Sequence, residues 1–358
     1  MKKLITLIFL LNLSFCFSQS LGNLQEEKIK TATEFAEKYL YDNKIPGMSI
    51  SVSKKGNIIW SIGFGYSNIE KKIKVSPNKT QFRIASISKS LTALALVKLA
   101  GRKQLKLDES IYTYIPDFPK KKHDFTVRQV AGHIAGIRHY NGNEFILDKK
   151  MSIVEGLGVF KDSPLKFKPG SAYSYSTYGW NLLSVVIQNA SKTEFNKYML
   201  DYIFNPLKMH STTVDVSGSD MPNRTQFYRK TNTDRIVLGP LVNNEYKVAG
   251  GGFISTSEDL IRFGNEIITP TIIWRYARNE LVKPQLLDSG ESTNYGIGFH
   301  IGQTKTGTPK YSHSGGGIGA STLLLIFPKE EIVISILTNL SQAPINEIGE
   351  EMETIFID

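Results

Sequence analysis

The segment from Phe82 to Gly101 constrains the fold of this chain most, because it predicts a helix without a polar face. After Ser90 its residues are apolar on nearly every side, and Lys98 is the only charge before the helix ends at Gly101. A helix that is hydrophobic all round is buried in a core. We therefore expect this helix to lie inside a globular domain, with the rest of the chain organised around it.

Lys89 lies near the start of this helix, where its charge would be buried. Burial disfavours the ammonium form, lowers the pKa of the amine and allows it to hold or relay a proton near neutrality. Ser86 stands three residues earlier, on the same helical face. At the first turn it also lies among free backbone N–H groups at the positive end of the helix dipole, which suits an oxyanion. The pair predicts a reactive serine.

The Ser-x-x-Lys spacing alone is not selective, since it occurs at Ser51/Lys54, Ser76/Lys79, Ser86/Lys89 and Ser163/Lys166. Ser51 belongs to an alternating, strand-like segment, in which residues three apart do not share a face. Ser76 and Ser163 are each followed by proline, and neither leads into a long apolar helix. Ser86 is the only one in a suitable context. Its alternative role is that of a helix cap, with Lys89 reaching out to solvent.

A second polar element, the loop from Pro169 to Thr177, is rich in glycine, serine and tyrosine and leads into another apolar helix. Loops in this position present polar side chains into clefts. Tyr175 would act as a general base if a neighbouring lysine lowered the pKa of its phenol. The alternative is that the tyrosines of this loop only pack at the rim of a cleft.

A third element, Tyr311 to Ser321, contains glycines that allow backbone to approach a ligand closely. Its Gly-x-Gly-x-x-Ala pattern precedes a strand rather than a helix, which argues against nucleotide binding. The 6 histidines lack metal-binding spacing, so neither a metal nor another cofactor is predicted. The chain also lacks the Gly-x-Ser-x-Gly motif of alpha/beta-hydrolases, which disfavours that class of esterase.

Strands are predicted near both ends of the chain, at residues 48–53, 58–64, 296–301, 321–326 and 331–337. Lys54 to Asn57 forms a hairpin turn between the first two. Helices are expected from Leu24 to Asn43 and near Ile345 to Ile355. We therefore predict an α/β (α+β) fold with a central antiparallel sheet built from both termini and flanked by helices. The sheet lobe would comprise about 24–80 and 245–358, with a mostly helical lobe, about 81–244, inserted between its parts.

The N-terminus, residues 1–18, has the basic start, short apolar stretch and small-residue exit of a secretory signal peptide. The mature protein, 19–358, would then be periplasmic or secreted; a lipoprotein anchored through Cys16 is the alternative. Signal cleavage would remove the single cysteine, and with it any disulfide or Cys-ligated zinc. No later segment is apolar and long enough to span a membrane. The net charge of +10 is attributed to a surface attracted to anionic envelope components, not to nucleic-acid binding.

In their order along the chain, these elements resemble the serine beta-lactamase and penicillin-binding protein superfamily, specifically its class C beta-lactamase-like branch. The motifs that carry the resemblance are Ser86-Ile87-Ser88-Lys89 for Ser-x-x-Lys, Tyr175-Ser176-Thr177 for Tyr-x-Asn, and His313-Ser314-Gly315 for the Lys/His-x-Gly strand. The sequence Gly-Ile-Arg-His-Tyr from Gly136 looks most like the subgroup of the mitochondrial serine beta-lactamase-like protein and its bacterial relatives. The resemblance covers most of the mature chain and implies the beta-lactamase/transpeptidase-like fold.

The resemblance also implies a mechanism of acyl transfer. Ser86 would attack a carbonyl, while Lys89 and Tyr175 pass its proton to the leaving group. The backbone N–H groups of Ser86 and Gly316 would form the oxyanion hole, and water activated by Tyr175 would complete hydrolysis. His133 lies outside the three motifs and is expected to be a structural hydrogen-bonding residue.

The implied substrate-binding residues are Thr177, His313, Ser314 and Gly315. Two of them depart from the usual pattern, since Thr177 replaces an asparagine and His313 replaces a lysine that would bind a substrate carboxylate. His313 would either recognise charge when protonated or act as a neutral hydrogen-bonding strand residue. A literal Lys-Thr-Gly at Lys305 lies in an expected hairpin tip and is treated as a decoy.

The expected function is that of an exported, beta-lactamase-related serine hydrolase that acts on a peptide, amide or ester bond of a small-molecule or peptide substrate. The alternatives are a true class C-type beta-lactamase, a D-alanyl-D-alanine carboxypeptidase, or a non-catalytic binding or self-assembling protein on the same fold. Weak turnover of classical beta-lactams is expected, because Thr177 and His313 replace the residues that grip an acylamino carboxylate. The motifs do not specify the substrate or the oligomeric state.

Overall fold

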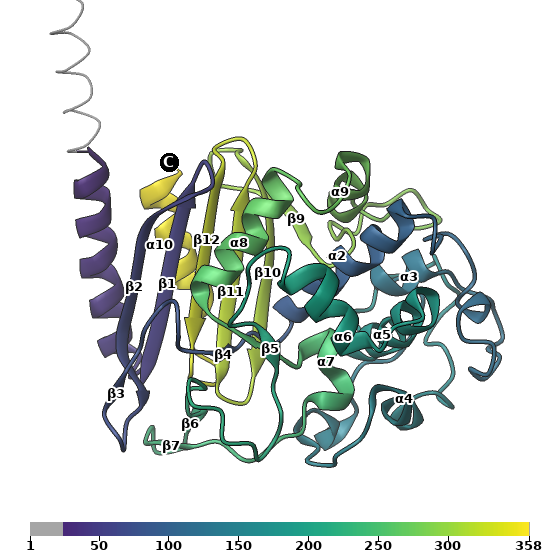
Figure 1. Cartoon of the computed structure of the whole chain (residues 1–358), viewed down its shortest axis with the longest axis horizontal. Coiled ribbons are helices and arrows are strands. Elements are labelled where there is room, and N and C mark those ends of the chain that lie inside the picture. The colour runs from purple at the N-terminus through teal and green to yellow at the C-terminus, as the bar shows by residue number, and fades with distance from the viewer. Residues whose placement is uncertain (1–23, 358) are drawn as a thin grey trace, which may run out of the picture.

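An antiparallel sheet of seven strands, built from two distant parts of the sequence, forms one side of the molecule (Figure 1). The computed structural model describes residues 24–357. In sheet order the strands are β3 (Ile73–Lys74), β2 (Asn57–Asn68), β1 (Gly47–Lys54), β12 (Ile332–Thr338), β11 (Ala320–Phe327), β10 (Pro309–Gly317) and β9 (His300–Gln303). The pairing of β1 with β12 joins the two parts, so the predicted sheet from both termini is confirmed.

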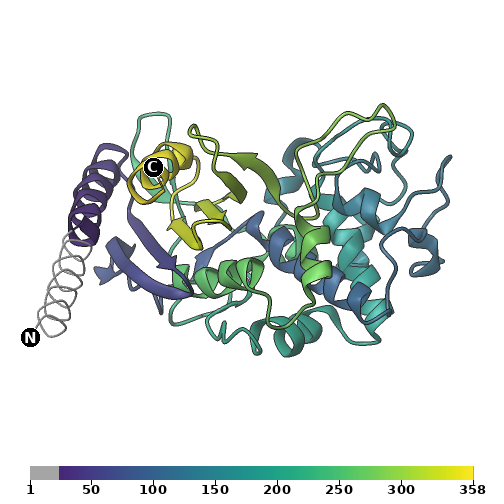
Figure 2. The same cartoon turned by 90° about the horizontal axis from the view of Figure 1, so that it is seen from above.

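The sheet is covered on both faces, because its central strands alternate apolar side chains between two cores. In β12, Ile334 and Ile336 face the core that contains the N-terminal helix (residues 24–42) and α10 (Ile345–Phe356), while Val333 and Leu337 face the other core. Helix α8 (Ser257–Ile268) lies across this second face (Figure 2). Gly264 allows its close approach, since a Cβ there would lie 2.4 Å from a methyl group of Val333.

Helix α2 (Ile87–Gly101) lies among the helices beside the sheet, and every residue from Ile87 to Leu99 is buried, as its apolar sequence predicts (Figure 1). The remaining α-helices are α3 (Val127–Ala131), α4 (Ile153–Gly156), α5 (Thr177–Ser191), α6 (Phe195–Met199), α7 (Val248–Gly251) and α9 (Arg275–Val282). Short helical turns occur at η1 (Ile111–Thr113), η2 (Gly142–Ile146), η3 (Leu157–Val159), η4 (Leu200–Phe204) and η5 (Glu245–Lys247). Small sheets are formed by β4 (Phe82–Arg83), β8 (Phe253–Ser255) and β5 (Thr213–Val214), and by β6 (Tyr228–Lys230) and β7 (Ile236–Leu238).

The strand predicted at 296–301 is wrong in its first half, since β9 begins only at His300. Gly298 has a φ of +77°, and the N–H of Gly296 donates to the carbonyl of Phe299 across a turn. The turn brings the chain against α2, where a Cβ on Gly298 would lie 2.8 Å from Ala93. Tertiary packing on α2 thus overrides the local strand pattern.

The hairpin tip between β9 and β10 is confirmed: the N–H of Thr304 donates to the carbonyl of Thr308 at 2.8 Å. It holds the Lys-Thr-Gly sequence that begins at Lys305. The predicted signal peptide, residues 1–18, lies outside the described residues. Within 24–357, no helix has the length and apolar character needed to cross a membrane.

Candidate active site

Ser86 lies at the N-terminal end of α2, directly after a residue with an unusual backbone conformation. Ala85 has a φ of +44°, in the left-handed region that residues with a Cβ rarely adopt. The Oγ of Ser86 makes no helix-capping hydrogen bond. The side chain is half-buried and lines a cavity of about 120 Å³. Its hydroxyl therefore faces a cavity and is not used to cap the helix.

Lys89 lies one helical turn further on and is completely buried, at 0% exposure. Its Nζ lies 3.0 Å from Ser86 Oγ, 3.3 Å from Thr177 Oγ1 and 2.5 Å from the carbonyl oxygen of Gly250 in α7. Burial, and then the charge of Lys247, hold the pKa of Lys89 well below its usual range. The amine is thus positioned to accept the proton of the Ser86 hydroxyl, and it does not reach out to solvent.

Tyr175 is half-buried beside the same serine, and Lys89 Nζ lies 4.9 Å from the centre of its ring. Burial raises the pKa of the Tyr175 phenol above its usual range, and a hydrogen bond to Ser86 offsets part of this rise. The expectation that a neighbouring lysine lowers this pKa is not met, because the dominant effect is desolvation. The phenol is therefore suited to relay a proton between two partners, and less suited to act as a phenolate base.

Two histidines hold the Tyr175 loop through backbone hydrogen bonds. The N–H of Ser176 donates to His133 Nδ1 at 3.0 Å, and the N–H of Thr177 donates to His139 Nδ1 at 3.1 Å. The His133 ring also packs against Tyr175, with 4.3 Å between ring centres. His133 thus has the structural role expected for it. His139 lines the cavity, and burial together with nearby lysines lowers its pKa to about 4.

The predicted oxyanion hole faces the same cavity, which both Ser86 and Gly316 line. Within the described part of the chain, the Ser86 N–H has no acceptor. A Cβ on Gly316 would meet nothing within 4 Å, whereas one on Gly315 would lie 2.4 Å from the carbonyl oxygen of Ile84. Strand β10 is therefore packed closely against the turn before Ser86 and leaves open space at Gly316.

His313 lies on β10 behind the cavity and is only 2% exposed. Its Nδ1 lies 2.6 Å from the carbonyl oxygen of Ser314, which can only accept, so Nδ1 carries the proton and Nε2 accepts from the Tyr295 hydroxyl at 3.0 Å. Burial and the charge of Lys89 hold the pKa of His313 well below its usual range. The neutral hydrogen-bonding role is thus favoured, and direct recognition of charge by His313 is not.

The other predicted substrate-binding residues occupy two places. Thr177 lines the cavity beside Lys89. Ser314 and Gly315 instead line a second hollow of about 420 Å³, which shares Phe145, Gly316, Gly317 and Ile318 with the first. The residues of the three motifs therefore line or adjoin two neighbouring hollows.

Lys247 and Gly250 also line the cavity, and neither was predicted from the sequence to belong to the site. Lys247 stands in Tyr246-Lys247-Val248-Ala249-Gly250, a lysine in an otherwise apolar stretch. A lysine within an apolar stretch was the feature that identified Lys89, so the same feature could have identified Lys247. Gly250 has no such signal, because its contribution to the site is a backbone carbonyl.

The Beta-lactamase family matches residues 30–350 of the chain. The human "Serine beta-lactamase-like protein LACTB, mitochondrial" is 28% identical, over 84% of this chain and 74% of the relative. Among solved structures, a D-stereospecific amidohydrolase from Streptomyces sp. superposes with a TM-score of 0.77 at 21% identity, covering 91% of this chain and 98% of its own. EstCE1, described as a hydrolase with promiscuous acyltransferase activity, superposes with a TM-score of 0.80 at 16% identity, covering 94% of this chain and 99% of its own. The chain therefore belongs to the beta-lactamase family.

Proposed function

We propose that this chain is an exported serine hydrolase that cleaves a peptide, amide or ester bond through an acyl-enzyme on Ser86. The observation that carries the proposal is the 3.0 Å contact between Ser86 Oγ and the amine of Lys89. That amine is completely buried and, within residues 24–357, has no carboxylate within 4 Å. A lysine in this setting is a base, because burial removes the solvation that would keep it protonated.

In the acylation step, Lys89 accepts the hydroxyl proton of Ser86 as Oγ forms a bond to the substrate carbonyl carbon. The carbonyl oxygen becomes negative and is stabilised by the backbone N–H groups of Ser86 and Gly316. Collapse of this intermediate breaks the bond to the leaving group, which takes a proton relayed through Tyr175. A water molecule, losing its proton along the same path, then cleaves the acyl-enzyme and restores the serine.

Acyl transfer at a peptide, amide or ester bond is supported by the titles of the two superposed structures, a D-stereospecific amidohydrolase and a hydrolase with promiscuous acyltransferase activity. Efficient beta-lactam turnover is less well supported. The amide of the usual asparagine is reduced to a hydroxyl at Thr177, and the usual strand lysine is a buried, neutral His313. Export is proposed from residues 1–18 alone, and N-terminal sequencing of protein recovered outside the cytoplasm tests it.

The central test is covalent labelling with a fluorophosphonate, followed by mass spectrometry of the modified peptide. We expect one adduct on Ser86 and its loss in Ser86→Ala, while Ser76→Ala is a matched control because Ser76 has the same spacing to a lysine. An adduct that survives in Ser86→Ala would show that another residue is the nucleophile and that the assignment of Ser86 is wrong. The absence of any adduct, with no turnover of nitrocefin, D-Ala-D-Ala peptides or short p-nitrophenyl esters, would indicate a non-catalytic binding protein.

A further inference from the structure

Lys247 is a second buried lysine in the wall of the candidate active-site cavity. It is 3% exposed, and its Nζ donates to the carbonyl oxygen of Phe145 at 2.8 Å. The rings of Tyr140 and Tyr246 lie 5.2 and 5.4 Å from this nitrogen. In the part of the chain from 24 to 357, Lys247 has no carboxylate within 4 Å, and no residue that lines the cavity is an aspartate or glutamate. A buried ammonium without an acidic partner is costly to a fold.

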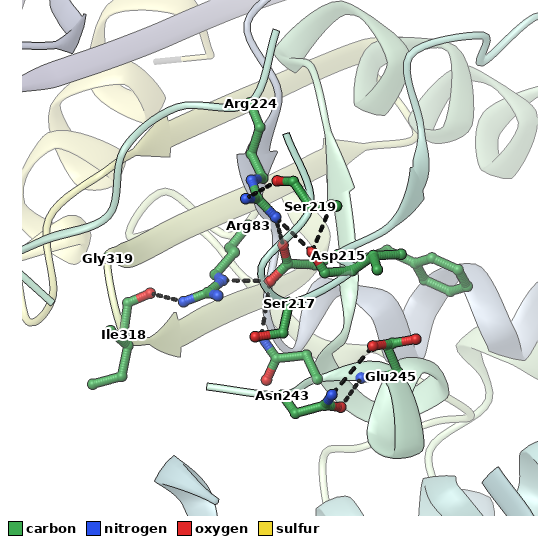
Figure 3. Close-up of polar contacts among 12 residues, drawn as sticks. Arg83, Asp215, Ser217, Ser219, Arg224, Asn243, Glu245, Ile318 and Gly319 are labelled. Atoms are coloured by element: carbon green, nitrogen blue, oxygen red, sulfur yellow. Dashed lines mark hydrogen bonds and ion pairs between the residues drawn. The ribbon is translucent and has the colours of Figure 1, made fainter. Parts of the chain in front are cut away.

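The guanidinium of Arg83, which also lines the cavity, differs from Lys247 because its charge is already paired with a buried carboxylate. Figure 3 shows the Asp215 carboxylate between Arg83 and Arg224. Arg83 Nε donates to Asp215 at 2.6 Å and its Nη1 to the carbonyl oxygen of Ile318 at 2.9 Å, while Arg224 donates to the other Asp215 oxygen at 3.1 Å. Asp215 is completely buried and also accepts from Asn244. The charge of Arg83 is thus balanced within the cavity wall, whereas among the described residues Lys247 has no carboxylate partner.

We propose that Lys247 binds a carboxylate group of the substrate and thereby makes the enzyme selective for anionic substrates. This inference rests on the proposed hydrolase function and specifies its substrate class. Lysine has three N–H donors, of which Phe145 uses one, so two remain for a carboxylate. The strand position at which related enzymes carry a lysine holds the neutral His313 here. Recognition of a substrate carboxylate is therefore assigned to Lys247, which lines the cavity, whereas His313 does not.

The surroundings of Lys247 agree with this role. Burial, and then the charge of Arg83, lower the pKa of Lys247 to about 7. An entering carboxylate would favour the ammonium form and gain a charge-assisted hydrogen bond from a nearly fully buried lysine. The cavity of about 120 Å³ is of the size that accepts a small group, since an apolar cavity of about 150 Å³ binds benzene.

Matched ester pairs test the proposal and locate the carboxylate. The acyl-side pair is 4-nitrophenyl hydrogen succinate and 4-nitrophenyl butyrate; the leaving-group pair is 4-acetoxybenzoate and 4-acetoxybenzamide. We expect the parent to prefer the anionic member of one pair, and Lys247→Met to reduce that preference in kcat/KM by tenfold or more. Lys247→Arg, which keeps the charge, should retain most of it. Lys247→Gln provides the same test if the methionine variant does not fold.

Lys98→Met is the matched control, because Lys98 is also buried at 5% exposure and also donates to a backbone carbonyl, that of Ile272 at 2.7 Å. Lys98 lies near the other end of α2 and does not line the cavity. The Lys98→Met variant should therefore show the same preference for the anionic ester as the parent. Neutral-ester turnover that depends on Ser86 but shows no Lys247-dependent preference in either pair would overturn the inference and leave the proposed function intact. No turnover of any ester, together with no fluorophosphonate adduct, would overturn the proposed function itself.

Discussion

Replacing Lys247 by methionine should stabilise the fold at neutral and acidic pH. The folded state holds the pKa of Lys247 at about 7, whereas its ordinary value is 10.5. At 1.36 kcal/mol per pH unit, this difference destabilises the folded protein by about 5 kcal/mol at pH 6. Methionine leaves the carbonyl of Phe145 without its donor, which costs about 1 to 3 kcal/mol. The expected net gain at pH 6 is therefore about 2 to 4 kcal/mol.

The sign of the pH dependence follows from the proton count. Between pH 7 and 10.5 the unfolded Lys247 binds a proton that the folded form does not, so the stability of the parent rises with pH. The penalty is fully present below about pH 7 and disappears as the pH approaches 10.5. The gain from Lys247→Met should thus fall by about 1.4 kcal/mol per pH unit across this range. Loss of the Phe145 hydrogen bond and any change in packing do not depend on pH in this way.

Urea unfolding of the parent and of Lys247→Met at pH 6, 7, 8.5 and 10 measures this difference directly. The charged and titratable groups that face Lys247 are Arg83, Lys89 and His139, together with the phenols of Tyr140 and Tyr246. They remain in both proteins, so most of their titration cancels in the comparison. A stability difference that stays constant with pH, or that grows as the pH rises, would refute the argument.

Three further outcomes are expected. Gly315→Ala should destabilise the fold by about 1 to 3 kcal/mol and lower kcat, because its Cβ would lie 2.4 Å from a backbone oxygen in the turn before Ser86; Gly316→Ala, with nothing within 4 Å, should change the urea midpoint little. Tyr175→Phe should lower kcat/KM about 10² to 10⁴-fold without a comparable loss of stability, since the half-buried ring is kept and only the proton relay is removed; near-parental kinetics would end that assignment. The KM of an anionic ester should rise above about pH 7 as free Lys247 loses its proton, and His313→Gln should preserve this rise whereas Lys247→Arg should remove it. Loss of the rise in His313→Gln would restore His313 as the group that recognises charge.

Much of the fold was predictable, because local sequence patterns and tertiary packing agree for most elements. β1 alternates apolar residues with serines, β12 is apolar at nearly every position and α2 is apolar on nearly every side, so each sequence agrees with the buried place that the element takes. The segment from Gly296 to Phe299 has a strand-like pattern as well. Its backbone is determined instead by contact with α2, which lies about two hundred residues earlier in the chain. Such a contact leaves no local signal.

The candidate site was predictable where it depends on spacing along one helix, and less so where it depends on contacts between elements. Ser86 and Lys89 are three residues apart, so their 3.0 Å contact follows from helix geometry. The neutrality of His313 depends on the Tyr295 hydroxyl, which belongs to none of the motifs. The role of Lys247 depends on the absence of an acid nearby, and a sequence alone does not show which side chains surround a cavity.

The acid-free cavity explains how two lysines can share one site in different roles. A carboxylate beside Lys89 would favour its ammonium form and remove the base, while one beside Lys247 would occupy the donors that the substrate needs. The buried acid of this region, Asp215, is held instead by Arg83 and Arg224. The two unpaired amines reduce stability, and the apolar packing around α2 and both faces of the sheet must offset that cost. A substrate carboxylate would then supply the counter-charge that the cavity lacks. Its binding would therefore offset part of the free-energy cost of burying Lys247.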